Sequence, residues 1–287
     1  MNKMGKILVP IVTPFNDDES VNYDALQQLV KKCIDDGADG IYAVGSSAEC
    51  YLLTEREKKK SLEAVMEAAE GAFVVASVGA VGTKLSVDLA KHAEKVGANM
   101  IASVPPFYFK YTFEEVKSYY TDLASCVDIP LMVYNIPSLT DRNFSLNELE
   151  QLLSIPNVNS IKYTDTDYFK MELLKNRTGA FIYSGRDECF LSAIAAGADG
   201  GIGTTFNVIV KKYIEIQKLY KQGDMASALK VQHEANEITE ILCQCGIFAA
   251  TKYLLEKKGI HAGIARKPFA ALTDEKRGLL DSIVDKI

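Results

Sequence analysis

Lys162 and Tyr134 are the residues of this sequence whose types and positions are best suited to covalent chemistry on a carbonyl group. Each ends a short apolar stretch of the chain. A desolvated lysine amine can attack a ketone and form a Schiff base. A phenol within hydrogen-bond reach of such an imine can transfer protons without a histidine. The two residues together are therefore a candidate for Schiff-base catalysis.

Both residues also have a purely structural interpretation. The long stem of a strand lysine can carry its ammonium to the rim of a barrel, or the ammonium can pair with a carboxylate. A tyrosine in the same setting is more often a packed aromatic whose hydroxyl is satisfied by a neighbour. The catalytic interpretation requires that Lys162 and Tyr134 face the same cavity.

Two further segments carry polar groups that could hold a substrate. Gly45-Ser46-Ser47 offers two hydroxyls and backbone N–H groups before a predicted helix, which suits a carboxylate, although such serines are often only an N-cap. Asp187 and Glu188 could bind the hydroxyls of a polyol, or could instead complement the dipole at the start of a helix.

A repeating pattern of strands and helices would position these residues. Three similar segments, which start at Asp36, Val96 and Ala196, each end an amphipathic stretch at a glycine suited to the left-handed C′ position before a short strand. Helical stretches follow the strands, several of them opened by capping boxes, as at Thr54, Thr112 and Ser145. We predict strands over residues 7–12, 40–44, 73–78, 100–104, 131–134, 159–161, 180–183 and 200–203.

Near-continuous apolar strands that alternate with helices predict a (β/α)8 TIM barrel, an α/β fold. An open doubly wound sheet is less favoured, because no G-x-G-x-x-G motif follows the first strand. The barrel is expected to take residues 1–223. Residues 224–287 are expected to form a C-terminal helical extension packed on the barrel, with helices over 225–243, 248–257 and 273–284, so that the chain is one structural domain overall. Active sites of such barrels lie at the carboxyl ends of the strands.

Composition and charge exclude several classes of protein. The 287 residues carry 32 Lys and Arg against 38 Asp and Glu, a net charge of −6, without a basic stripe, so we expect no nucleic-acid partner. The apolar runs are too short for a membrane span. Six scattered cysteines and the lack of a signal-like start predict reduced thiols in a cytoplasmic protein. None of the three histidines falls at a strand end, so no metal site is expected.

Motifs at five strand ends resemble those of the N-acetylneuraminate lyase and dihydrodipicolinate synthase family of class I, pyruvate-dependent aldolases. The resemblance covers nearly the whole chain. Tyr108 in its Pro-Phe-Tyr motif and Arg266 in Arg-Lys-Pro favour the lyase branch, and Leu139 stands where the synthases usually carry an arginine. The five motifs are Gly45-Ser46-Ser47-x-Glu49, Tyr134-Asn135-Ile136-Pro137, Lys162, Gly185-x-Asp187-Glu188 and Gly200-x-Ile202-Gly203-Thr204-Thr205-Phe206-Asn207.

The resemblance implies a role for each candidate residue. Lys162 would form the Schiff base with C2 of a small keto acid or sugar acid, and no cofactor would be needed. Ser46 and Ser47 would hold the C1 carboxylate, and Tyr134 would move the proton of the C4 hydroxyl. Tyr108, often donated across a subunit interface, would complete a hydroxyl relay with Ser47 in a homotetramer built as a dimer of dimers. The residues implied to bind the sugar are Thr164, Gly185, Asp187, Glu188, Thr204 and Phe248.

The implied reaction is cleavage of N-acetylneuraminate to pyruvate and N-acetylmannosamine. Ala48, Asp141 and Arg186 depart from the family pattern, which usually has glycine at the first two positions and an aromatic residue at the third. Ala48 and Arg186 motivate an alternative, a lyase or aldolase of another 2-keto-3-deoxy sugar acid. Dihydrodipicolinate synthase is a less favoured alternative, and a keto-acid-binding regulatory barrel is the non-enzyme alternative.

Overall fold

Eight parallel strands close into a barrel in the computed structural model, which describes residues 7–287. Each strand pairs with the next along the chain, and β1 pairs with β8. The predicted TIM barrel and its eight predicted strands are confirmed; residues 1–6 of the predicted barrel segment lie outside the described residues. The strands are β1 (Ile7–Pro10), β2 (Gly40–Ala43), β3 (Phe73–Ser77), β4 (Met100–Ser103), β5 (Leu131–Asn135), β6 (Val158–Tyr163), β7 (Phe181–Ser184) and β8 (Gly200–Ile202).

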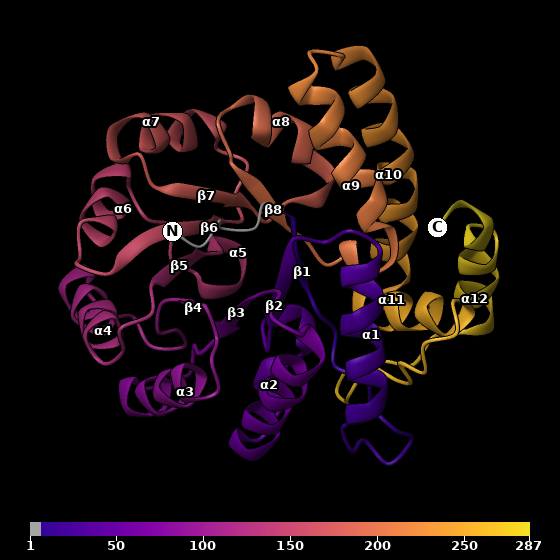
Figure 1. Cartoon of the computed structure of the whole chain (residues 1–287), viewed down its shortest axis with the longest axis horizontal. Coiled ribbons are helices and arrows are strands. Elements are labelled where there is room, and N and C mark those ends of the chain that lie inside the picture. Colours follow the sequence, from indigo (N-terminus) through magenta and orange to yellow (C-terminus); the bar gives the residue numbers. More distant parts are fainter. Residues whose placement is uncertain (1–6) are drawn as a thin grey trace.

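Helices surround the strands, which occupy the centre of Figure 1. The capping boxes at Thr54, Thr112 and Ser145 are confirmed, since each hydroxyl accepts from the N3 backbone N–H while the N3 glutamate accepts from the cap. A single helical turn, α5, follows β5 and was not predicted. The helices of the barrel are α1 (Tyr23–Asp35), α2 (Glu55–Ala69), α3 (Thr83–Lys95), α4 (Phe113–Ser125), α5 (Pro137–Thr140), α6 (Leu146–Leu153), α7 (Tyr168–Thr178), α8 (Phe190–Ala195) and α9 (Phe206–Lys221).

Glycines turn the chain from helix to strand in the three similar segments. Gly37, Gly97 and Gly197 have φ values of 98°, 91° and 100°, a left-handed conformation that costs a residue without a β-carbon little. The next strand begins three residues later in each case, at Gly40, Met100 and Gly200. The predicted helix-to-strand joint is therefore confirmed.

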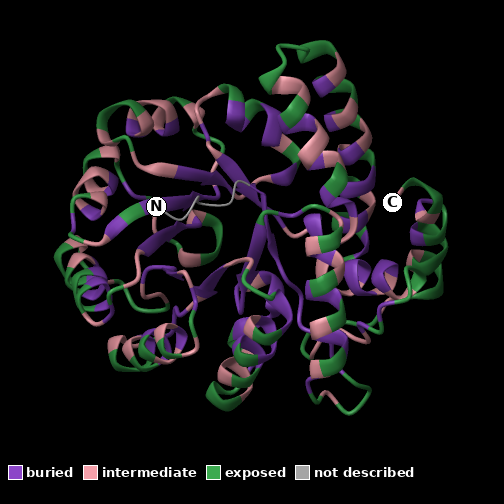
Figure 2. Cartoon of the chain, viewed as in Figure 1, coloured by how far each residue is buried: buried purple, intermediate pink, exposed green. Residues whose placement is uncertain are grey.

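Two apolar layers hold the barrel together. The larger layer lies between the strands and the surrounding helices, and Figure 2 shows buried strands inside helices whose outer faces are exposed. A smaller cluster that includes Leu8, Met100 and Met132 takes its side chains mainly from the strands and fills the barrel interior. Tyr134 belongs to this inner cluster, so its phenol lies at the top of the packed interior.

The C-terminal extension consists of α10 (Met225–Cys245), α11 (Ile247–Lys257) and α12 (Asp274–Asp281), as predicted. Asp224 caps α10 by accepting from the backbone N–H of Ser227 at 3.0 Å. Helix α10 packs against α8 and α9, α11 packs against α9 and α10, and all three lie on one side of the barrel in Figure 1. The division of the chain at residue 223 stays a prediction.

Within residues 7–287, no single helix is long and apolar enough to cross a membrane. Helices α10 and α11 meet the criteria of length and hydropathy only as a pair, and that pair is bent by 116°. The same residues contain no group of three or more His, Cys, Asp or Glu side chains placed to hold a metal ion. The lack of a metal or cofactor remains a prediction.

Candidate active site

A cavity of about 300 Å³ lies at the carboxyl ends of the barrel strands. Side chains from the ends of β2, β5, β6, β7 and β8 line it, together with side chains of α10 and α11. All the predicted site residues except Tyr108 therefore meet in one place, where barrel active sites lie. They are Ser46, Ser47, Tyr134, Lys162, Thr164, Gly185, Asp187, Glu188, Thr204 and Phe248.

Lys162 and Tyr134 lie side by side on β6 and β5, because the strand register pairs them directly. The Lys162 side chain is buried, and its Nζ lies 4.2 Å from the centroid of the Tyr134 ring and 4.8 Å from that of Tyr42. No carboxylate in the described part of the chain lies within 4.0 Å of this ammonium. The two structural interpretations of Lys162, an ammonium that reaches the rim and an ammonium paired with a carboxylate, therefore do not apply. Lys162 instead presents its amine to the cavity beside a phenol.

Ser46 and Ser47 begin a short 3₁₀ turn, η1 (Ser46–Ala48), directly after β2. The N-cap of the following helix α2 is Thr54, so the two serines do not cap that helix. The Ser47 hydroxyl lies 2.7 Å from the Thr204 hydroxyl, which follows β8. The turn therefore places two hydroxyls in the cavity wall, where they can bind a carboxylate.

Asp187 and Glu188 begin the 3₁₀ turn η3 (Asp187–Cys189), which precedes α8. The Asp187 carboxylate is buried and accepts from the backbone N–H and the hydroxyl of Thr205 at 2.8 and 2.7 Å. Burial raises the pKa of Asp187 to about 6, although the hydrogen bonds from Thr205 act in the opposite direction. Glu188 is exposed, and one of its oxygens lies 3.4 Å from Nη1 of Arg186.

Gly185 and Gly203 lie so close to neighbouring side chains around the cavity that no residue with a β-carbon fits at either position. A β-carbon on Gly185 would lie 1.9 Å from Oγ1 of Thr164, and one on Gly203 would lie 1.7 Å from Oδ1 of Asp187. The Thr164 hydroxyl is also buried without a hydrogen-bond partner among residues 7–287. Because buried polar groups are normally paired, a bound ligand is a fitting partner for this hydroxyl.

Residues of α10 that the sequence patterns did not single out form hydrogen bonds with the turn η3, which follows β7. Gln232 donates to the carbonyl oxygen of Asp187 at 3.1 Å, and Asn236 donates to that of Glu188 at 3.0 Å. One and two turns further along the same helix, Thr239 and Cys243 line the cavity. These positions recur at intervals of three and four residues, so a polar stripe on one helix face was the available signal. They are Gln232, Asn236, Thr239 and Cys243.

Tyr108 is the predicted site residue that the structure does not bring to this cavity. Its side chain is 86% exposed, its φ is 79°, and its ring packs edge-on against Phe109 at 5.1 Å. It lines a separate hollow, together with Leu139 and Asp141. Within one chain, the partner of the Ser47 hydroxyl is Thr204 and not Tyr108.

The three departures from the family pattern lie in different surroundings. Ala48 is buried, and its carbonyl oxygen accepts from the Thr13 hydroxyl at 2.9 Å. Asp141 is exposed and forms an ion pair with Lys110. Arg186 lines the cavity beside Glu188. Of these three residues, Arg186 is therefore the one placed to affect which substrate is accepted.

Comparisons with known proteins agree with this geometry. A model of the dihydrodipicolinate synthetase family matches residues 3–287. The chain is 34% identical over 285 residues to N-acetylneuraminate lyase 2 of Escherichia coli O6:H1, a match that covers 98% of this chain and 93% of that protein. CdNal from Clostridium difficile, solved in complex with mannosamine, has a TM-score of 0.97 at 33% identity and 99% coverage of both chains. A catalytic lysine mutant of a sialic acid aldolase from Ruminococcus gnavus has a TM-score of 0.96 at 29% identity, covering 99% of this chain and 96% of that chain.

Proposed function

Because the chain belongs to the dihydrodipicolinate synthetase family, we propose that it is a carbon–carbon lyase that cleaves N-acetylneuraminate to pyruvate and N-acetylmannosamine. The observation that carries the proposal is the buried Lys162 amine beside Tyr134, in a cavity lined by hydroxyl and carboxylate groups. The names of the relatives from E. coli and R. gnavus support the choice of a sialic acid as substrate.

The reaction begins when Nζ of Lys162 attacks the C2 ketone of the open-chain sugar acid. Water leaves, and a protonated imine joins C2 to the lysine. The Ser46 and Ser47 hydroxyls and the backbone N–H groups of their turn bind the C1 carboxylate, which fixes C2 over the amine. The positive imine then serves as the electron sink, so no cofactor is required.

Tyr134 gives its phenolic proton to the hydroxyl that leaves C2 as water, and cleavage follows when the resulting phenolate takes the proton of the C4 hydroxyl. The C3–C4 bond breaks, its electron pair passes into the imine to give an enamine, and C4 becomes the aldehyde carbon of N-acetylmannosamine. The enamine then takes a proton at C3, and water hydrolyses the resulting imine to release pyruvate and the free amine of Lys162. A phenol can perform this transfer without a histidine.

Other hydroxyl and carboxylate groups of the cavity wall bind the sugar portion. The unpaired Thr164 hydroxyl donates to a sugar oxygen or accepts from a sugar hydroxyl, and the exposed Glu188 carboxylate accepts from sugar hydroxyls. Phe248, on α11, packs against Phe269 with ring centroids 5.0 Å apart and offers an apolar surface to the far end of the sugar. Gly185, Asp187 and Thr204 complete this part of the site.

A substrate panel tests the proposed reaction. Pyruvate release is measured with N-acetylneuraminate and with several other 2-keto-3-deoxy sugar acids, and N-acetylneuraminate is expected to be the best substrate. Arg186 in the cavity wall favours the second candidate, a lyase of another sugar acid that carries a group which a guanidinium binds. No pyruvate from N-acetylneuraminate, together with cleavage of another acid, would establish that second candidate instead.

The titration of Asp187 predicts an acid limb in the pH dependence of cleavage. Because burial raises the pKa of Asp187 to about 6, the carboxyl is ionised above that pH and takes a proton below it. Protonation removes the charge from the acceptor of the two Thr205 hydrogen bonds. We expect kcat/KM for N-acetylneuraminate to fall as the pH drops through about 6, while Asp187→Asn loses this limb. Persistence of the limb in Asp187→Asn would assign it to another group.

We propose that Tyr108 reaches the site of a second subunit in a homotetramer built as a dimer of dimers. Its exposure and strained backbone support a role outside its own chain. Tyr108→Phe and Lys162→Ala are each expected to be inactive. When equal amounts of the two variants are unfolded together and refolded, about half of the subunit pairs contain one chain of each kind, and one of the two sites in such a pair has both residues intact. The mixture is therefore expected to regain up to about a quarter of the wild-type activity. A mixture as inactive as its components would show that Tyr108 does not act in trans.

We also propose a cytoplasmic location, which cell fractionation checks.

A further inference from the structure

Lys252, on α11 of the C-terminal extension, is a fully buried cation about 200 residues along the chain from the serine motif that follows β2. Its Nζ donates to Oε1 of Glu49 at 2.5 Å and to the carbonyl oxygen of Ile264 at 2.7 Å. The same nitrogen lies 4.2 Å from the centroid of the Phe15 ring. Buried charges persist where they are paired, and these contacts pair this ammonium fully. Burial lowers the pKa of Lys252 to about 8, against the opposing effect of Glu49.

Glu49 directly follows the turn that carries Ser46 and Ser47. The turn is closed by two backbone hydrogen bonds of 3.0 Å, from Ala48 to Gly45 and from Glu49 to Ser46. Glu49 has φ 56° and ψ 36°, a left-handed conformation that is uncommon for a residue with a long side chain. Contacts on its buried carboxylate must therefore maintain the local shape of the turn.

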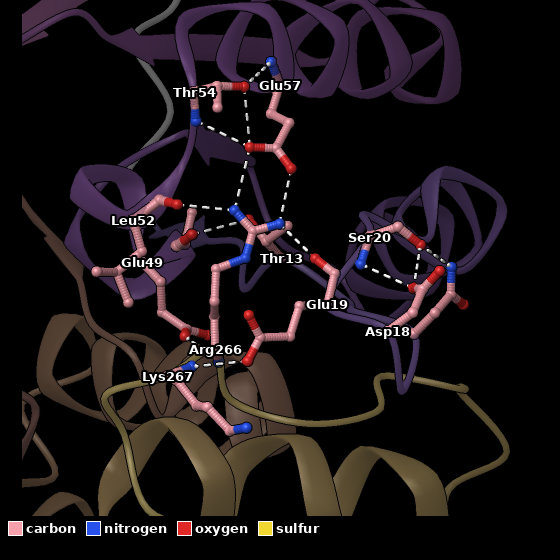
Figure 3. Close-up of polar contacts among 12 residues, drawn as sticks. Thr13, Asp18, Glu19, Ser20, Glu49, Leu52, Thr54, Glu57, Arg266 and Lys267 are labelled. Carbon is pink, nitrogen blue, oxygen red and sulfur yellow. Dashed lines mark hydrogen bonds and ion pairs between the residues drawn. The ribbon is translucent and has the colours of Figure 1, made fainter.

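Arg266 holds the same carboxylate from a second segment of the extension. Its backbone N–H donates to Oε2 of Glu49 at 2.8 Å, so both carboxylate oxygens are bound. Its guanidinium donates to both oxygens of Glu57, at 2.7 and 3.1 Å, and to the carbonyl oxygen of Leu52 at 2.7 Å (Figure 3). Residues that follow the Ser46–Ser47 turn are thus bound to the C-terminal extension by several hydrogen bonds and ion pairs.

We propose that Lys252 is a positioning residue of the active site. By binding the carboxylate of Glu49, it holds the Ser46–Ser47 turn in the shape that receives the carboxylate of the keto acid. The proposal rests on the proposed Schiff-base function and deepens it, because it assigns part of the pyruvate half of the site to the extension. Without the ion pair, the turn relaxes and the keto acid binds weakly, whereas the chemistry of Lys162 is unchanged.

The double variant Glu49→Gln, Lys252→Met tests this inference. It removes both buried charges together and so leaves no charge without a partner. The full-length protein is incubated with pyruvate over a range of concentrations and reduced with borohydride, and the adduct is quantified by mass. The pyruvate concentration for half-maximal trapping is expected to rise about tenfold or more, while trapping at saturating pyruvate changes by less than about threefold.

Two further variants separate positioning from a loss of stability. Lys175→Met, Asp199→Asn removes an ion pair of 2.6 Å at the amino end of β8, away from the serine turn, and is expected to bind pyruvate like the wild type. Glu49→Gln alone keeps Lys252 and an acceptor oxygen, and is expected to shift half-saturation less than the double variant does. Thermal unfolding identifies which proteins are folded. If the double variant is not folded, the pyruvate concentration for half-maximal trapping is compared between Glu49→Gln and the wild type instead.

The outcomes distinguish this inference from the proposed function. If the wild type traps no keto acid at all, the Schiff-base function and this inference fail together. If the wild type traps pyruvate and a folded variant has unchanged half-saturation, the inference alone is overturned. A loss of trapping at saturating pyruvate without a change in half-saturation also overturns it, because that result describes damage to the chemistry and not to the binding of the carboxylate.

Discussion

Lys162→Ala is expected to abolish the reducible adduct with pyruvate and to lower the turnover of N-acetylneuraminate by about 10⁴-fold or more, to the level left by binding alone. Among residues 7–287, no other lysine lines the cavity, so none of them offers a second amine in the place of Nζ. Without the imine, the electron pair of the C3–C4 bond has no acceptor. Turnover is measured as pyruvate release, and adduct formation by mass after borohydride reduction.

The fold of this variant is expected to stay intact. A buried ammonium without a carboxylate within 4.0 Å among the described residues costs free energy, so its removal is expected not to lower the unfolding temperature. Lys212→Ala, which removes an ion pair with Glu234 on the outside of the barrel, is the matched control and should retain wild-type turnover. Turnover of Lys162→Ala at the level of this control would refute the assignment.

Tyr134→Phe is expected to separate the two halves of the reaction. The variant keeps the aromatic ring that packs 4.2 Å from Nζ of Lys162 but loses the hydroxyl that takes the C4 proton. Imine formation with pyruvate should continue, while cleavage of N-acetylneuraminate falls by about 10²- to 10⁴-fold. Single-turnover kinetics with borohydride trapping measure the two steps in the same protein.

Tyr42→Phe is the matched control for this variant. Tyr42 presents a second ring to Lys162, at 4.8 Å, but its side chain is absent from the residues that line the cavity. Its loss of a hydroxyl should change cleavage by less than about threefold. Equal losses in Tyr42→Phe and Tyr134→Phe, or unchanged cleavage in Tyr134→Phe, would remove Tyr134 from the proton path.

The barrel could be predicted from the sequence because its signals are local. A glycine such as Gly97 fixes a left-handed turn, and a capping box such as that at Thr112 fixes a helix start, whatever lies elsewhere in the chain. Repetition of these signals gave the number of units. The short turn α5 was missed, because a single turn leaves no periodic pattern.

The cavity wall formed by the strand ends could also be predicted, since barrel topology gathers those ends in one place. The contact between Lys162 and Tyr134 depends on the register of β5 and β6, which the sequence does not state. The contributions of Gln232 and Lys252 could not be derived, because helical periodicity indicates which face is buried but not which part of the barrel it covers. The place of Tyr108 in the site of a second subunit stays a proposal, because within one chain its side chain is 86% exposed.

Peptide mass spectrometry of the wild-type protein, after borohydride reduction in the presence of pyruvate, tests directly whether Lys162 forms the Schiff base. We expect one reduced pyruvate per chain, on the peptide that contains Lys162, and no labelling of the buried Lys252, which is paired with Glu49. An unlabelled protein, or a pyruvate adduct on a different lysine, would contradict it.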